Sequence, residues 1–191
     1  MLRSNELLGA QRSELFDLDG DNPRFDVPLK RVKKRRMIQQ PLSDLAIEII
    51  REALEDDREH IFASPLGDHP MNRKVMATAL RGTKHKGTVN TPGICALLGL
   101  KPFTPHDLRR TAATLAGDFG FDDAWIAKCL DHAASKKQEQ IAPSVTGKVY
   151  NHSKRLKEKR AVLDGIAAEL RRIIGEPTAM AHIKIGSRLA A

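Results

Sequence analysis

The feature that most constrains the fold is a helix start at Thr104 and Pro105, followed by His-Asp-Leu-Arg-Arg-Thr. A threonine hydroxyl can cap first-turn amides, and proline fits the first helical position, where no backbone N–H is needed. On the predicted helix, His106 and Arg109 are three residues apart and therefore share one face. A second, apolar face that can be buried consists of Leu108, Ala112 and Leu115. The sequence thus predicts an amphipathic helix that presents an imidazole beside a guanidinium.

A second predicted helix, over residues 122–131, delivers His132 at its C-terminal end. Its predicted buried side chains are Trp125, Ile126, Cys129 and Leu130. Residues 133–147 contain Ser, Lys, Gln, Pro and Gly, which predicts an exposed loop. Tyr150, the only tyrosine of the chain, then lies at the start of a long basic amphipathic segment. Two histidines, an arginine and a tyrosine therefore follow one another in a single stretch.

Side chains of these types can together attack a phosphate without a metal ion. An arginine fork binds two phosphate oxygens and stays charged, and a histidine can bind the same oxygens or carry a proton. A lysine can protonate the departing alkoxide. Tyrosine is a weak nucleophile while its pKa is about 10, so it needs cations around it and a phosphate to attack. The pattern indicates phosphoryl transfer as a candidate reaction.

Each of these residues also has a purely structural interpretation. A single tyrosine is most often a core or surface residue, and His106 with Arg109 can be a solvated helix face. His132 can complement a helix dipole, and the basic run 30–36 can be a solvated turn. The functional signal therefore comes from the order and spacing of the residues, not from any one of them.

The rest of the chain predicts helices around a small β-hairpin. Residues 24–29 and 37–42 can pair as two strands, with the basic run 30–36 as the tip of the hairpin. Pro28 favours an edge position for the first strand. Further helices are predicted over residues 5–8, over 43–57 with Ser43 as N-cap, over 71–80 and over 148–174, and a loop over 82–99.

The last predicted helix, residues 148–174, ends where Gly175 and then Pro177 stop it. Its apolar stripe is predicted to consist of Leu156, Leu163, Ile166, Ala167, Leu170 and Ile174. The predicted fold class is mainly α with a small β-hairpin or sheet.

The net charge of +8 suits a polyanionic partner, although charge alone does not separate such a protein from a merely basic one. Cys95 and Cys129 are far apart without a CxxC spacing, which argues against a zinc site or a disulfide framework and favours a reducing compartment. No apolar run has membrane-spanning length, and residues 1–4 do not open a signal peptide. We therefore expect no membrane partner.

Three segments resemble the catalytic domain of the tyrosine recombinases, the phage-integrase family, and among them the prophage and genomic-island integrases. These segments are residues 106–111 (His-Asp-Leu-Arg-Arg-Thr), 130–132 (Leu-Asp-His) and 149–151 (Val-Tyr-Asn). Arg109 and His132 are 23 residues apart (132 − 109), as the family expects. The hairpin that leads into a helix upstream also resembles the family. The resemblance implies an N-terminally truncated catalytic domain over residues 1–176 and a flexible tail over residues 177–191.

The resemblance implies that Tyr150 attacks the scissile phosphate of double-stranded DNA and forms a 3′-phosphotyrosyl link. Lys33 would then protonate the leaving 5′-oxygen. Neither a metal, ATP nor another cofactor is implied. Further DNA-binding residues are implied at Lys30, Arg31, Lys34, Arg35, Arg36 and Arg110.

The non-bridging oxygens would be clamped by Arg12 and Arg109, with His106 and His132 completing the shell. Family members usually show Arg-x-x-Glu at the first clamp, whereas residues 12–14 (Arg-Ser-Glu) are one residue shorter. Either Arg12 is the clamp beside a local deletion, which we favour, or Gln11 occupies its place and the clamp is lost.

His132 and Tyr150 are 18 residues apart (150 − 132), a longer spacing than is common in the family, and a loop insertion explains it. The alternatives are a catalytically impaired, basic DNA-binding fragment of an integrase and a type IB topoisomerase-like enzyme. The resemblance implies a cytoplasmic, nucleoid-associated protein encoded by a bacterium or phage. It implies four protomers on two duplexes, and a monomer is the alternative state for a chain of this length.

Overall fold

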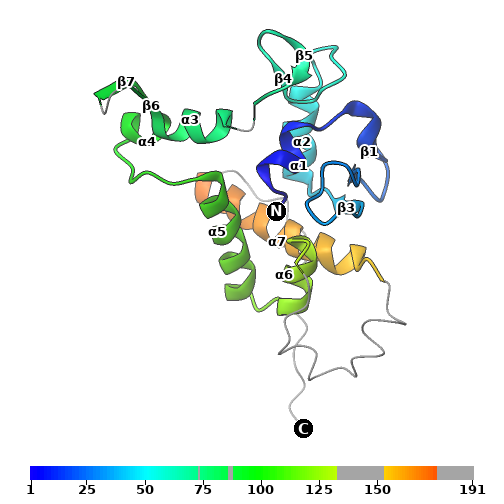
Figure 1. Cartoon of the computed structure of the whole chain (residues 1–191). Helices are drawn as coiled ribbons and strands as arrows, with labels where there is room; N and C mark the ends of the chain where they lie inside the picture. The colour runs from blue at the N-terminus through cyan, green and yellow to red at the C-terminus, as the bar shows by residue number, and fades with distance from the viewer. Residues whose placement is uncertain (73, 86–87, 133–152, 176–191) are drawn as a thin grey trace.

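The structure is a computed structural model that describes residues 1–72, 74–85, 88–132 and 153–175 (Figure 1). Its helices are α1 (Ser4–Leu8), α2 (Asp44–Ala53), α3 (Val75–Arg81), α4 (Ile94–Leu97), α5 (Pro105–Asp118), α6 (Asp123–Cys129) and α7 (Leu156–Ile174), with a 3-10 turn η1 (Arg12–Glu14). Its strands are β1 (Leu15–Phe16), β2 (Arg24–Val27), β3 (Ile38–Pro41), β4 (Ala63–Ser64), β5 (Gly67–Pro70), β6 (Gly82–His85) and β7 (Thr88–Pro92).

The predicted β-hairpin is confirmed as β2 and β3, which pair antiparallel from Arg24 opposite Pro41 to Val27 opposite Ile38. The side chains of Phe25 and Val27 are buried, as alternation along a half-buried strand requires. A short strand that was not predicted, β1, adds to the outer edge of β2 and makes a three-stranded sheet. The basic run between β2 and β3 forms a turn, as predicted.

The first hydrophobic core lies where α2 packs against this sheet. Its buried members are Ala10, Phe25, Val27, Val32, Ile38, Leu42, Ile47, Ile50 and Ile61. Ser43 caps α2 by accepting a hydrogen bond from the Ala46 amide at 3.4 Å, as its position in the sequence predicted. The helix ends at Ala53, earlier than the predicted residue 57.

The second core joins α5, α6 and α7, which lie together in Figure 1. Its buried members are Ala116, Ile126, Cys129, Leu130, Val162 and Ile166. Gly165 of α7 lies so close to Phe121 that a Cβ atom there would be 2.9 Å from the ring. This glycine therefore allows the close approach of α7 to the turn between α5 and α6.

Helix α7 also connects the two cores, because Lys159 is 3% exposed and its Nζ donates to the carbonyl of Gln39 in β3. Gly175 caps the C-terminal end of α7 in the left-handed conformation (φ 77°), as predicted. None of the helices in the described ranges is both long and apolar enough to cross a membrane.

Several predictions about local structure were wrong. The last helix begins at Leu156, not at residue 148. Leu170 and Ile174, two members of the predicted apolar stripe, are exposed, whereas Val162 is fully buried. The described residues of the predicted loop 82–99 form the hairpin strands β6 and β7 and then α4, because pairing of backbone groups gives structure to a stretch without apolar periodicity. The predicted loop 133–147, Tyr150 and the tail 177–191 lie outside the described residues.

Candidate active site

The start of α5 is fixed by a reciprocal cap. The Thr104 hydroxyl accepts from the Asp107 amide at 3.2 Å, and Asp107 Oδ2 accepts from the Thr104 amide at 2.9 Å. The Thr104 hydroxyl also donates to Asp107 Oδ2 at 2.7 Å, and this bond, followed by the one from the Thr104 amide, lowers the pKa of Asp107. The cap determines where the first turn begins and so places His106 and Arg109 on the same side of α5.

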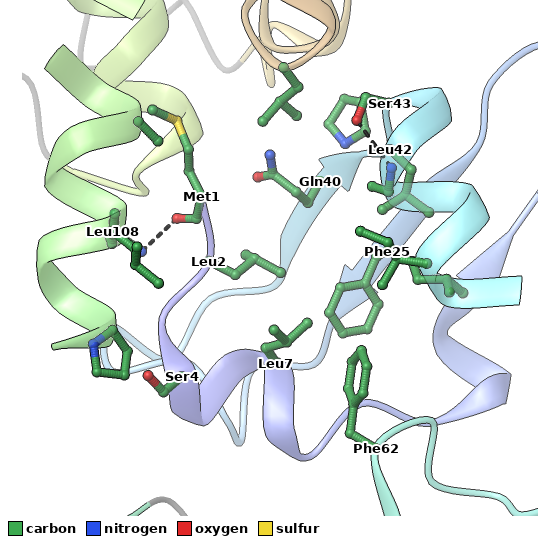
Figure 2. A pocket seen from close by; sticks show the side chains of 18 of the residues that line it. Met1, Leu2, Ser4, Leu7, Phe25, Gln40, Leu42, Ser43, Phe62 and Leu108 are labelled. Carbon is green, nitrogen blue, oxygen red and sulfur yellow. Dashed lines mark hydrogen bonds between the residues drawn. The ribbon is translucent and has the colours of Figure 1, made fainter. Parts of the chain in front are cut away.

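Arg109 is the buried cation of the site, with 7% of its surface exposed. Its Nη1 donates to the Met1 carbonyl at 2.7 Å, and its Nη2 donates to the Leu130 carbonyl at the end of α6. Figure 2 shows the first of these bonds, which crosses from α5 to the N-terminal segment that carries Leu2. Burial, and then the charge of Arg3, lower the pKa of Arg109. Arg109 is thus held in one orientation by two separate segments.

Arg3 lies beside Arg109 in a polar cavity of about 230 Å³. The cavity is lined by Leu2, Arg3, Ser4, Asn5, Pro105, His106 and Arg109. Glu6 is only 1% exposed, and its carboxylate accepts from the Arg3 amide and from Arg3 Nη1, both at 2.7 Å. This buried carboxylate fixes the side chain of Arg3 at the wall of the cavity.

His132 follows α6 after Leu130 and Asp131 and is exposed to solvent. Burial is the largest cause that lowers its pKa, and the charges of Arg109, Arg3 and Lys34 lower it further. His132 therefore stands in the same positive field as the two arginines. A region of converging cations favours an anion, because an anion relieves their mutual repulsion.

A larger apolar pocket of about 390 Å³ adjoins this site (Figure 2). In this pocket Leu2 and Leu7 of the N-terminal segment face Phe25 of the sheet and Phe62. Leu108 of α5 closes another side of the pocket. Apart from Arg109, its lining carries no charged side chain. The chemistry of the site therefore belongs to the smaller, polar cavity.

The turn between β2 and β3 is fastened to the end of α6. Lys34 Nζ donates to the Asp131 carbonyl at 2.9 Å, and Arg36 Nε donates to Asp131 Oδ1 at 2.8 Å. Lys33 precedes Lys34 in this turn and is exposed. The structure thus brings the turn of Lys33 to the residue next to His132, while Lys33 is not part of the cavity lining.

The predicted DNA-binding residues divide into two groups. Arg31 is turned inward: it donates to both carboxylate oxygens of Glu14, at 2.9 and 2.5 Å, and its guanidinium lies 5.9 Å from the ring centre of Phe25. Arg31 therefore makes intramolecular contacts, and Lys34 and Arg36 are engaged with Asp131. The remaining members, Lys30, Arg35 and Arg110, are exposed.

The structure places Arg12, the predicted first clamp, away from the cavity. Its Nε donates to the Arg58 carbonyl at 2.5 Å, and its Nη2 donates to the carbonyls of Leu54, at 2.6 Å, and Asp56. The guanidinium of Arg12 thus binds the C-terminal end of α2, where helix carbonyls need donors. Gln11, the alternative, forms an isolated β-bridge with His60 and does not line the cavity either.

Arg3 is the residue that sequence reasoning missed. Residues 3–6 read Arg-Ser-Asn-Glu, which is Arg-x-x-Glu without any deletion. Glu6 binds Arg3, whereas Glu14 binds Arg31 and not Arg12. The full Arg-x-x-Glu spacing was the signal that could have identified it.

The fold and the site together define a mainly helical protein with small antiparallel sheets and a cationic cavity suited to an anion. The model of the phage integrase family matches residues 1–155, and the chain belongs to this family. It therefore carries the catalytic domain of a tyrosine recombinase, as the resemblance predicted. Neither the comparison with curated proteins nor that with solved structures gave a match.

Proposed function

We propose that this domain breaks and rejoins DNA strands at specific sites through a covalent intermediate on Tyr150. The observation that supports this most strongly is the shared cavity of Arg3, His106 and Arg109, with His132 in the same positive field. A phosphodiester is the anion that such a clamp fits, because arginine forks bind its two non-bridging oxygens. The resemblance to prophage and genomic-island integrases supports a role in integration and excision.

In the proposed reaction the phenolic oxygen of Tyr150 attacks the phosphorus in line with the leaving 5′-oxygen. A bond forms between phosphorus and the tyrosine oxygen, and the bond from phosphorus to O5′ breaks. O5′ takes a proton from Lys33, and the phenol proton passes to solvent water. Arg3 and Arg109 hold the non-bridging oxygens as their charge grows. The energy of the broken ester is retained in the 3′-phosphotyrosyl ester, so the 5′-hydroxyl of another strand can reverse the step.

The burial of Arg109 and Glu6 supports this proposal. A clamp that is oriented before the substrate arrives needs little reorganisation in the transition state. Glu6 holds Arg3, and the carbonyls of Met1 and Leu130 hold Arg109. Exposed Lys30, Arg35 and Arg110 supply charge for the DNA backbone, so binding should weaken steeply with added salt.

The test is a trapping experiment on a pool of nicked duplexes whose sequence around the nick is randomised. Cleavage releases a short strand at the nick, so that the covalent complex accumulates and survives denaturing electrophoresis. The wild-type chain should form it, and peptide mass spectrometry should place the link on Tyr150. Tyr150→Phe should remove the adduct while duplex binding stays nearly unchanged. An adduct that persists in this variant would refute the role of Tyr150.

The alternative of a non-catalytic DNA-binding protein drew part of its support from the shortened segment at Arg12. The segment of Arg3 has the full spacing, so this observation no longer supports the alternative. Salt-dependent duplex binding without an adduct on any member of the pool would favour it again. Relaxation of a supercoiled plasmid without strand exchange would instead favour topoisomerase-like activity.

A further inference from the structure

Asp131 has a backbone conformation that is unusual for a residue with a side chain. It lies between Leu130 and His132 with a φ of 48°, in the left-handed region, where glycine is the least strained residue. Its side chain is nevertheless buried, and the residue is 8% exposed. A buried carboxylate at a position that suits glycine is explained best by the contacts that the carboxylate makes.

The donors in those contacts all belong to the turn between β2 and β3. Arg36 donates to Oδ1 of Asp131 through both Nε, at 2.8 Å, and Nη2. Lys34 donates to the carbonyl of the same residue at 2.9 Å. These two donors lie one and three residues after Lys33, so they fasten the segment that carries it.

The two carboxylate oxygens of Asp131 differ in their contacts. Oδ2 of Asp131 is buried and has no hydrogen-bond partner among the described residues. The negative charge of Asp131 also acts against the cations that lower the pKa of His132. Asp131 therefore sits between the turn of Lys33 and the end of α6 and is bound or electrostatically coupled to both.

We infer that Asp131 is a positioning residue, which fastens the turn between β2 and β3 to the end of α6 and so places Lys33 for proton transfer. The inference rests on the proposed strand cleavage. A general acid works only within hydrogen-bond reach of the atom it protonates. Lys33 is exposed in a turn, so it depends on a neighbouring attachment to stay within reach. Asp131 acts through Lys33 and touches no DNA in this scheme.

The test compares two nicked duplexes that differ in the leaving atom, either the natural 5′-oxygen or a 5′-bridging sulfur. A thiolate leaves without a proton because thiols have a pKa of only about 8.5. Cleavage of the sulfur substrate should therefore bypass the general acid. Asp131→Gly, which suits the backbone, and Asp131→Asn should slow adduct formation on the oxygen substrate by about 10-fold or more. On the sulfur substrate both variants should stay within about 2-fold of the wild-type chain, as Lys33→Ala should.

Arg36→Gln removes the partner on the other side of the contact and should reproduce this pattern. Arg51→Gln is the matched control, because Arg51 also pairs with an aspartate, Asp19, and its side chain is equally exposed at 54%. The control should cleave both substrates at the wild-type rate. Equal losses on the two substrates, or no loss on either, would overturn the positioning role. A wild-type chain that forms no adduct with either substrate would instead refute the proposed function, and this inference with it.

Discussion

Two short segments near the start of the chain carry nearly the same residues and do different things. Residues 3–6 and residues 12–14 each place an arginine before a glutamate, and each opens a single turn of helix, α1 or η1. Both glutamates are buried and accept from the backbone at the start of the turn. The local structures are alike, and the difference lies in the destination of each arginine.

In the first segment the arginine stays with its own glutamate and lines the polar cavity beside Arg109. In the second segment Glu14 binds Arg31, and Arg12 turns away to three carbonyls that follow α2. Those carbonyls accept hydrogen bonds from the guanidinium of Arg12, so the contact is structural. The comparison teaches that an arginine can serve a ligand only if its remaining donors face a cavity.

The largest effect should come from Arg3. Arg3→Ala removes one of the two proposed phosphate clamps and should reduce the rate of adduct formation by about 10²–10³-fold, the usual loss for one transition-state donor. Thermal stability should fall as well, because the buried carboxylate of Glu6 loses its charged partner, so the rate is measured at a temperature where the variant is folded. Arg3→Lys should restore little activity, since a lysine cannot bind two oxygens in a fork. Single-turnover cleavage of a selected duplex measures the rate.

Arg12→Ala is the control for this experiment, since it removes the same side chain from the similar segment. At a temperature where the variant is folded it should cleave at the wild-type rate. The assignment of different roles to Arg3 and Arg12 would be contradicted if Arg12→Ala lost as much activity as Arg3→Ala while its melting temperature stayed that of the wild type. That result would assign Arg12 to the phosphate clamp.

The second prediction concerns stability. Arg12→Ala leaves the carbonyls of Leu54, Asp56 and Arg58 without their charged donor, and hydrogen bonds to charged groups contribute about 1.5–3 kcal/mol each. Because water can replace the donor at this partly exposed site, we expect a loss of about 1–3 kcal/mol in the free energy of unfolding. Urea denaturation followed by circular dichroism measures it. An unchanged midpoint would show that the contacts of Arg12 do not stabilise α2.

Much of the local structure was predictable because it depends on neighbouring residues. The cap of α5 at Thr104, the cap of α2 at Ser43 and the stop of α7 at Gly175 all follow from short-range hydrogen bonding or backbone preference. The hairpin of β2 and β3 follows from alternation on either side of a polar turn. The boundaries were predicted less well because fraying and tertiary packing decide them.

The role of Arg12 could not be read from its neighbours, since its acceptors lie more than 40 residues away along the chain. The same holds for Asp131, whose partner Arg36 is 95 residues away. The position of Arg3 in the cavity was missed for another reason. The full Arg-x-x-Glu spacing is present in residues 3–6, but the short helix expected over 5–8 made the later arginine the natural choice. In this chain the spacing within the motif was the better guide than its position relative to a helix.

The smallest predicted effect is the pH dependence of DNA binding, and it depends on His132. Burial and the charges of Arg109, Arg3 and Lys34 lower the pKa of His132 from its ordinary value of about 6.5, so the free protein holds it neutral at pH 7. A phosphate in the cavity offsets the nearby positive charge and should raise this pKa, so that binding takes up a proton. Affinity must then rise as the pH falls from 8 to 6, by up to about tenfold for each unit of pKa change.

Fluorescence anisotropy of a labelled duplex at constant ionic strength measures this dependence. His132→Asn, which cannot take up the proton, should reduce the slope of this pH dependence. Arg3→Ala should also reduce it, because removing the positive charge of Arg3 relieves some of the depression of the His132 pKa before DNA binds. Arg12→Ala should leave the slope unchanged, since Arg12 is not among the charges that act on His132. An equal reduction in both arginine variants would mean that the two segments act on one anion site, which is the opposite of the division of roles between Arg3 and Arg12.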